Sequence, residues 1–139
     1  MPVLSTVFKL HTKGFCDIHD ITARVDEFIR KCALHNGIVT VFVPGSTASV
    51  TTIEFESGAI EDLKRAIERI APTGIEYAHD TRWGDGNGFA HIRAALLGPS
   101  LSIPLVDGDL RLGTWQQIVL IDFDNRPRQR EIVVQAVGE

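Results

Sequence analysis

The sequence has little sulfur and no long apolar run. Only two cysteines, Cys16 and Cys32, occur in 139 residues, and they are not spaced as CxxC. A disulfide framework or a cysteine zinc site is therefore not expected. No apolar stretch approaches the roughly 20 residues needed to cross a bilayer, and residues 1–12 lack the features of a signal peptide. We therefore expect a cytoplasmic protein with no membrane partner.

An excess of positive charge is also missing. The chain has 14 Lys and Arg against 18 Asp and Glu, which gives a formal net charge of -4. Because nucleic-acid binders are usually basic, no nucleic-acid partner is expected. The balance leaves room for a small phosphorylated ligand held by a few arginines. With no repeat or linker visible, residues 1–139 are expected to form one domain.

The spacing of apolar residues predicts three short helices. The first begins at Asp20 as its N-cap and ends at Gly37, and the second covers residues 58–70. The third has Asn87 as a possible cap and ends at Gly98. The remaining apolar segments predict strands near residues 4–10, 38–43, 49–56, 100–106, 113–123 and 130–137.

These elements predict an α+β fold. We expect a β-sandwich-like core of about seven strands, either a two-layer sandwich or a distorted barrel, with two to three short helices packed outside. The β-branched run 38–43 is expected to be covered on both faces. The segment "DNRPRQ", residues 124–129, predicts a hairpin between the last two strands.

The densest group of chemistry-bearing residues is "YAHDTRWGDGNGFAH", residues 77–91. Neutral imidazoles of His79 and His91 are good zinc ligands, and Asp80, Asp85 or Glu54 could complete a metal site. Histidine is also suited to proton transfer near neutral pH. The structural alternative is that both histidines are ordinary hydrogen-bonding loop residues.

Three alternating glycines lie inside this segment, at 84, 86 and 88. Such a loop can bring backbone N–H groups close to a ligand. It runs into a predicted helix N-terminus, which favours an anion. Gly86, Asn87 and Gly88 are therefore candidates for binding a phosphate. A flexible turn is the alternative.

A second concentration of polar residues is "PGSTASVTTIEFE", residues 44–56. Ser46 and Thr47 fall in a predicted turn and are candidate ligand-binding residues. Glu54 falls on a predicted strand among β-branched neighbours. Burial there would raise its pKa and suit it to acid–base chemistry or metal binding. Glu56 is the better candidate for a glutamate that faces solvent.

Residues 113–130 supply the last candidates. Trp115 is expected in the core or an interface, and either Gln116 or Gln117 could reach a polar pocket. Arg128 and Arg130 could bind phosphate through their guanidinium groups. The alternative is a solvated hairpin that exposes at least two of the arginines at 126, 128 and 130.

Several segments together resemble one family. "STASVTTIE", "YAHD", "NGFAHIRAALLGPSLSIPL", "LGTWQQIVLIDFD" and "RQREIVVQAVGE" are similar, in this order, to segments of the YjbQ-like family, also called the secondary thiamine-phosphate synthase enzyme family. The resemblance covers essentially the whole chain. It implies a compact α+β fold with a β-sandwich-like core, usually assembled as a homotrimer.

The resemblance also implies a polar pocket near subunit boundaries. In the family, this pocket uses two histidines, which map to His79 and His91, and an acidic residue, which maps to Glu54. A side activity that joins the pyrimidine and thiazole halves of thiamine phosphate is attributed to the family. This sequence departs from the family pattern at Gly45, where many members carry a histidine. A three-histidine metal site is therefore not available from the matching positions.

The leading hypothesis is a YjbQ-like enzyme that forms a carbon–nitrogen bond and releases pyrophosphate. Its substrate would be a small phosphorylated heterocyclic metabolite, and its cofactor a divalent metal, zinc or magnesium. His79 and His91 would bind the metal or move protons, with Glu54 as partner acid or base. The alternative is a metal- or metabolite-binding homotrimer without significant turnover of its own.

Overall fold

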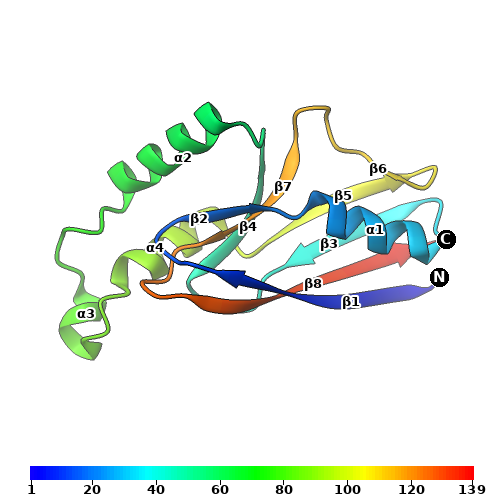
Figure 1. Ribbon diagram of the computed structural model, residues 1–139. Helices are drawn as coiled ribbons and strands as arrows, with labels where there is room; N and C mark the ends of the chain where they lie inside the picture. Colours follow the sequence, from blue (N-terminus) through cyan, green and yellow to red (C-terminus); the bar gives the residue numbers. More distant parts are fainter.

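The computed structural model describes residues 1–139, which form eight strands and four helices (Figure 1). In chain order these are β1 (Val3–Thr12), β2 (Asp17–Asp20), α1 (Thr22–Cys32), β3 (Gly37–Phe42), β4 (Ala48–Ile53), α2 (Ser57–Ile70), α3 (Ala78–Trp83), α4 (Gly88–Leu97), β5 (Ser100–Val106), β6 (Asp109–Leu110), β7 (Gln117–Asp122) and β8 (Arg128–Gly138). No helix is both long and apolar enough to span a membrane.

The larger sheet has the strand order β1-β8-β3-β5-β6 and is antiparallel throughout. β8, which lies between β1 and β3, alternates buried and exposed residues, so that Ile132, Val134 and Ala136 face the core. This is the period-2 pattern of a strand with one buried face. The inner face packs against α1, through Val25 and Ile29, and against the smaller sheet.

The smaller sheet has the order β2-β7-β4, and its middle strand β7 is buried on both faces. Ile118 and Leu120 point toward the larger sheet, whereas Val119 and Ile121 point toward α2 and α4. The molecule therefore has three layers: the larger sheet, the smaller sheet and a helical layer. β7 is an almost purely apolar run because a strand covered on both faces has no exposed side.

The helical layer brings the histidine-rich segment back onto the smaller sheet. α2 leads away from β4, and the chain returns through α3 and α4 (Figure 1). α4 then packs on β4, where Ser49 Oγ donates a hydrogen bond to the Ala94 carbonyl. Gly88 begins α4 against Tyr77, and a Cβ added at Gly88 would lie 2.4 Å from the Tyr77 Cβ. The small residue therefore permits the close approach of α3 and α4.

The mixed α+β expectation is correct, but two predictions about the strands are wrong. Residues 38–43 are buried on one face only, because no element covers Ile38, which is 58% exposed on the outer side of the larger sheet. Residues 124–129 do not close a hairpin, because β7 and β8 belong to different sheets. β2 and β6 were not predicted, since strands of four and two residues carry little periodicity.

The helix predictions need similar corrections. α1 ends at Ala33, which has a φ of 53°, and Gly37 instead opens β3. α3 lies in a segment that was expected to be a loop, because its six residues have no apolar stripe. Glu56 accepts hydrogen bonds from the N–H groups of Gly58 and Ala59 and thereby caps α2. Its role is structural, at a helix N-terminus, where a carboxylate is favoured.

Candidate functional site

A buried ion network lies where β7 ends and β8 begins. Asp122 and Asp124 are completely buried. Arg130 reaches back from β8 and donates from Nε and Nη2 to the two oxygens of Asp122, at 2.6 and 2.9 Å. Such a bidentate ion pair restricts the orientation of both groups more than a single hydrogen bond does. The pair joins the two sheets at their shared end.

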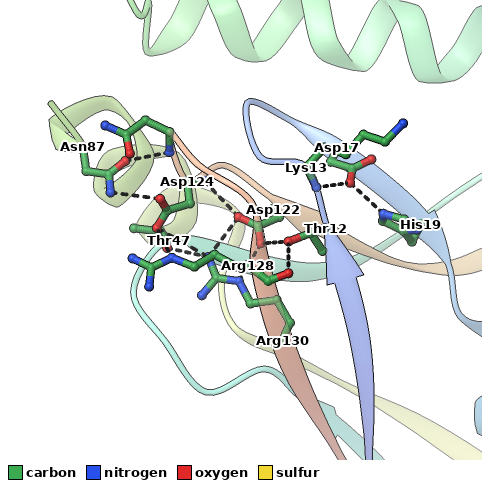
Figure 2. Close-up of polar contacts among 11 residues, drawn as sticks. Thr12, Lys13, Asp17, His19, Thr47, Asn87, Asp122, Asp124, Arg128 and Arg130 are labelled. Carbon is green, nitrogen blue, oxygen red and sulfur yellow. Dashed lines mark hydrogen bonds and ion pairs between the residues drawn. The ribbon is translucent and has the colours of Figure 1, made fainter.

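Polar residues from three other elements complete this network (Figure 2). Thr12, at the end of β1, donates to Asp122, and Arg130 Nη2 donates to the Thr47 hydroxyl at 2.6 Å. Asp124 accepts hydrogen bonds from Thr47, Asn87 and Arg128, as the close-up shows. Because a buried carboxylate needs such partners, the network holds these segments in fixed relative positions.

The ionisation of Asp124 makes the stability of the fold depend on pH. Burial alone would raise the pKa of Asp124, but hydrogen bonds from Asn87 and Thr47 and the charge of Arg128 outweigh it and leave the pKa below 3.8. The ionised group therefore stabilises the fold above about pH 3.8, and this contribution is lost as the pH falls through the folded-state pKa.

We expect Asp124→Asn to be less stable than the wild type at pH 7. The difference in melting temperature between the two proteins should become smaller toward pH 2. The reason is that the wild-type carboxylate becomes protonated over this range and loses its advantage. Thermal unfolding at several pH values measures the gap. A difference in melting temperature that stayed constant from pH 7 to pH 2 would contradict the assignment.

The two histidines of residues 77–91 lie together beside this network. His79 comes from α3 and His91 from α4, and their ring centroids are 4.4 Å apart. Asp85, from the loop between the two helices, places Oδ1 3.2 Å from His79 Nδ1. One ligand atom each from His79, Asp85 and His91 lies within 4.8 Å of the other two. Among the predicted site residues, these three form the tightest group of metal-binding atoms.

The surroundings of His79 fit a metal ion. Its Nδ1 is buried and has no hydrogen-bond partner, the only such side-chain atom in the chain. Two ligands of one tetrahedral zinc, each about 2.0–2.1 Å from the metal, lie roughly 3.3 Å apart. The separation of 3.2 Å between His79 Nδ1 and Asp85 Oδ1 matches this value. A shared cation would also bind this nitrogen, which makes no hydrogen bond.

Two N–H groups of the glycine-rich loop are engaged by aspartates of the chain itself. The Gly88 N–H donates to Asp80 Oδ1 at 2.8 Å, and the Asn87 N–H donates to Asp85 Oδ1 at 3.1 Å. Gly86 has a φ of +70°, as its position in a tight turn requires. Aspartates therefore accept from two of the three N–H groups that were candidates for binding a phosphate at this helix N-terminus, and the phosphate site stays a prediction. The loop instead positions Asp85 beside His79.

The arginine-rich segment also differs from the solvated hairpin that was considered for it. Arg130 is buried and Arg128 is half-buried, and of the three only Arg126 is exposed and without a side-chain partner. The sequence pointed to the arginines but not to Asp122 and Asp124. These aspartates were read as the end of a strand and part of a hairpin. Their position directly after the buried run "IVLI" was the available signal, since buried carboxylates require partners.

The chain was compared with known protein families, related sequences and solved structures. The family model described as "UPF0047 protein YjbQ-like" matches residues 6–139. The chain belongs to the YjbQ-like family. A UPF0047 protein of Archaeoglobus fulgidus is 38% identical over 128 residues, which cover 92% of this chain and 97% of that protein. One from Methanothermobacter thermautotrophicus is 34% identical and covers 100% of this chain and 95% of its own length.

Solved structures share the YjbQ-like fold. A hypothetical protein from Aeropyrum pernix K1 superposes with a TM-score of 0.91 at 32% identity, over 98% of this chain and 99% of that one. A YbjQ-like protein of unknown function from Sulfolobus solfataricus P2 gives a TM-score of 0.90 at 30% identity, over 99% and 100% of the two chains. These structures confirm the α+β architecture with a β-sandwich-like core.

The remaining predicted residues of this YjbQ-like chain lie away from the histidines. β4 begins beside Asp122 and ends beside Gln117. Glu54 therefore follows the far end of a strand about 20 Å long, and it is exposed rather than partly buried. Gln116 is exposed and donates to the Thr52 hydroxyl. Within one chain, neither Glu54 nor Gln116 reaches the histidine pair. Trp115 is 71% exposed, so it is not a core residue of the single chain.

Proposed function

We propose that this YjbQ-like protein binds a divalent metal through His79, Asp85 and His91 and uses it to hold the phosphoryl end of a small heterocyclic metabolite. The observation that carries the proposal is a group of three ligand atoms within 4.8 Å of one another, beside a buried imidazole nitrogen that makes no hydrogen bond. Three protein ligands leave a coordination position for a substrate oxygen, as in catalytic rather than structural zinc sites.

The donor set favours zinc over magnesium. Imidazole nitrogens and one carboxylate are typical zinc ligands, whereas magnesium prefers an all-oxygen environment. When bound, such an ion supplies positive charge that stabilises a departing phosphate. His79 and His91 would hold the ion from two different helices, and Asp85 would add a negative ligand. Asn87, whose N–H donates to Asp85, would keep that carboxylate in place.

The reaction we propose is the formation of a carbon–nitrogen bond with release of pyrophosphate. The lone pair of a heterocyclic ring nitrogen attacks the carbon that bears the pyrophosphate. The carbon–oxygen bond breaks, and its electron pair leaves with the pyrophosphate. An aromatic ring nitrogen without a hydrogen becomes a cation and releases no proton. The step therefore requires no general base, which is consistent with the distance of Glu54 from the histidines.

Pyrophosphate release from a pyrimidine diphosphate and a thiazole phosphate, in the presence of zinc, tests the proposal. We expect turnover by the wild type, and a loss of at least about 100-fold in His79→Ala and in His91→Ala with folding intact. Full activity in both variants would refute the assigned roles. Zinc binding without turnover of any candidate pair would support the alternative function, a metal- or metabolite-binding protein.

We also propose that the protein assembles as a homotrimer, as the family resemblance implies. The outer side of α4 supports an assembly, because Ile92 and Leu96 are 46% and 62% exposed there, one and five positions after His91. Ile70, on α2, adds a third exposed apolar side chain. A helix that is apolar on nearly all faces is normally covered.

Replacing Leu96 by glutamate should shift the protein from trimer to monomer, because it introduces a charge into the proposed apolar contact. Light scattering coupled to size-exclusion chromatography measures the mass. Val106→Glu is a matched control, since Val106 is also an exposed apolar residue but belongs to β5. A wild-type monomer would refute the trimer, and a Leu96→Glu trimer would place the contact elsewhere.

A further inference from the structure

We infer that residues 45–47, together with Arg128 and Arg130, bind the phosphate monoester of the second reactant, the one that supplies the ring nitrogen. This inference rests on the proposed function, because it assigns a place to a reactant of that reaction. It depends on different residues from the metal site, so the two can be tested separately.

Arg130 provides the first free donor. Its side chain is only 9% exposed, and Nε and Nη2 are engaged by Asp122 and Thr47. Nη1 makes no hydrogen bond within the chain and is reached by solvent. It lies 3.0 Å from the point that a Cβ on Gly45 would occupy. A nearly buried guanidinium therefore presents one N–H₂ group beside the bare backbone of Gly45.

Arg128 provides further donors on the same side. Its Nε donates to Asp124 at 3.0 Å, and its terminal nitrogens have no partner in the chain. The side chain is 37% exposed. In the close-up, the guanidinium groups of Arg128 and Arg130 lie next to one another beneath Thr47 (Figure 2). Two adjacent guanidinium groups with free edges are suited to a phosphate, whose oxygens accept several such hydrogen bonds.

The backbone of residues 45–47 adds a third set of donors. The N–H groups of Gly45, Ser46 and Thr47 donate no hydrogen bond to any backbone carbonyl, and no side chain accepts from them. Thr47 is nevertheless buried, and Gly45 has a φ of +126°. Gly45 and Ser46 are exposed, so their N–H groups are open to a ligand. Successive N–H groups in such turns commonly bind anions.

The two nearby carboxylates balance the charges of Arg128 and Arg130 but leave part of each guanidinium group free. Every oxygen of Asp122 and Asp124 already accepts at least one hydrogen bond within the network. The free guanidinium nitrogens are those that the carboxylates leave unused. The subsite also adjoins the metal-binding residues, because Asp124 links Thr47 to Asn87, whose N–H donates to Asp85. One reactant held by the metal and another held here would therefore be neighbours.

Gly45 is essential to this arrangement. Any side chain at this position would come against Arg130 Nη1 and would adopt a backbone conformation that L residues rarely tolerate. The histidine that the family resemblance implies at this position would fill the same space. We therefore expect the phosphate subsite to be a property of chains that carry glycine here.

Calorimetric titration of the metal-free, full-length protein with inorganic phosphate and with phenyl phosphate tests the inference. We expect binding of both, weakened about tenfold or more in Arg128→Gln, because a charge-assisted pair of donors is lost. Arg126→Gln is the matched control: it removes the same charge from an exposed arginine without a partner. A weakening of similar size in both variants would reveal a nonspecific charge effect and overturn the inference.

Gly45→Ala gives an independent test that leaves the charges unchanged. We expect it to weaken phosphate binding about tenfold, whereas Gly98→Ala should leave it unchanged. Gly98 also has a positive φ, of +88°, but no atom lies within 4 Å of an added Cβ. Circular dichroism checks that both variants fold. Unchanged phosphate binding in a folded Gly45→Ala protein would contradict the subsite.

Zinc titrations of the same proteins separate this inference from the proposed function. A wild type that binds zinc but no phosphate below about 10 mM would refute the subsite and leave the metal site standing. A wild type that binds phosphate but no zinc would refute the metal site and leave the phosphate subsite standing. If both sites exist, His79→Ala/His91→Ala should lose zinc and keep phosphate. Arg128→Gln should keep zinc and bind phosphate about tenfold more weakly.

Discussion

His79→Ala/His91→Ala should bind no stoichiometric zinc, whereas the wild type should bind about one zinc per chain. The double variant removes both imidazoles of the group and leaves Asp85 as the only protein ligand. A single carboxylate cannot hold zinc at micromolar concentration against water. Elemental analysis of protein purified without an affinity tag, followed by titration of the chelator-treated protein, measures the difference.

The chain offers a matched control for this experiment. His11 and His35 are exposed histidines on other elements, and neither belongs to the metal-binding group. His11→Ala/His35→Ala removes the same number of imidazoles and should keep the zinc. Absence of metal from the wild type after saturation with zinc would refute the site. Equal loss in both double variants would show that zinc binds at the surface without a specific site.

Arg130→Ala should be the most destabilising single substitution in the buried network. It leaves Asp122 completely buried, with hydrogen bonds only from Thr12 and the Asp124 N–H. Breaking a buried ion pair in this way costs on the order of 3–5 kcal/mol in the free energy of unfolding. For a domain of this size, we expect a melting temperature lower by roughly 10 °C or more. Chemical denaturation and calorimetry measure the change.

A double-mutant cycle tests whether Arg130→Ala lowers the stability because it leaves Asp122 without its ion-pair partner. In Asp122→Ala/Arg130→Ala neither charge remains unpaired, so the loss should be clearly smaller than the sum of the two single losses. Arg126→Ala, an exposed arginine in the same segment, should change stability by less than about 0.5 kcal/mol. Additive effects in the cycle, or an Arg130→Ala protein as stable as Arg126→Ala, would contradict a coupled buried pair.

Local periodicity was sufficient for the long elements. Alternation in β1 and β8 and the apolar stripes of α1 and α2 report a buried face directly, because each side chain's direction follows from its position along the element. The same logic failed on α4. Phe89, Ile92 and Leu96 have the spacing of one helix face, but of these three only Phe89 is buried, together with Ala90 and Ala94. A helix that is apolar on most faces does not reveal which face a single chain buries.

The pairing of strands was less predictable than the strands themselves. β7 and β8 are consecutive, and the short polar link between them is typical of a hairpin. They nevertheless enter different sheets, since β7 pairs with β2 and β4 whereas β8 pairs with β1 and β3. Strand pairing depends on contacts between residues far apart in the sequence. No local pattern near residues 124–129 specified them.

The sequence by itself determined the α+β class, the extent of most elements and the candidacy of His79 and His91, because spacing and side-chain chemistry are local properties. Only the tertiary structure decided which polar groups meet. It placed Asp85 beside His79, and it paired the N–H groups of Asn87 and Gly88 with aspartates. It also separated Glu54 from them by the length of β4. Distances between side chains from different elements follow from sheet pairing and helix packing, which involve the whole chain.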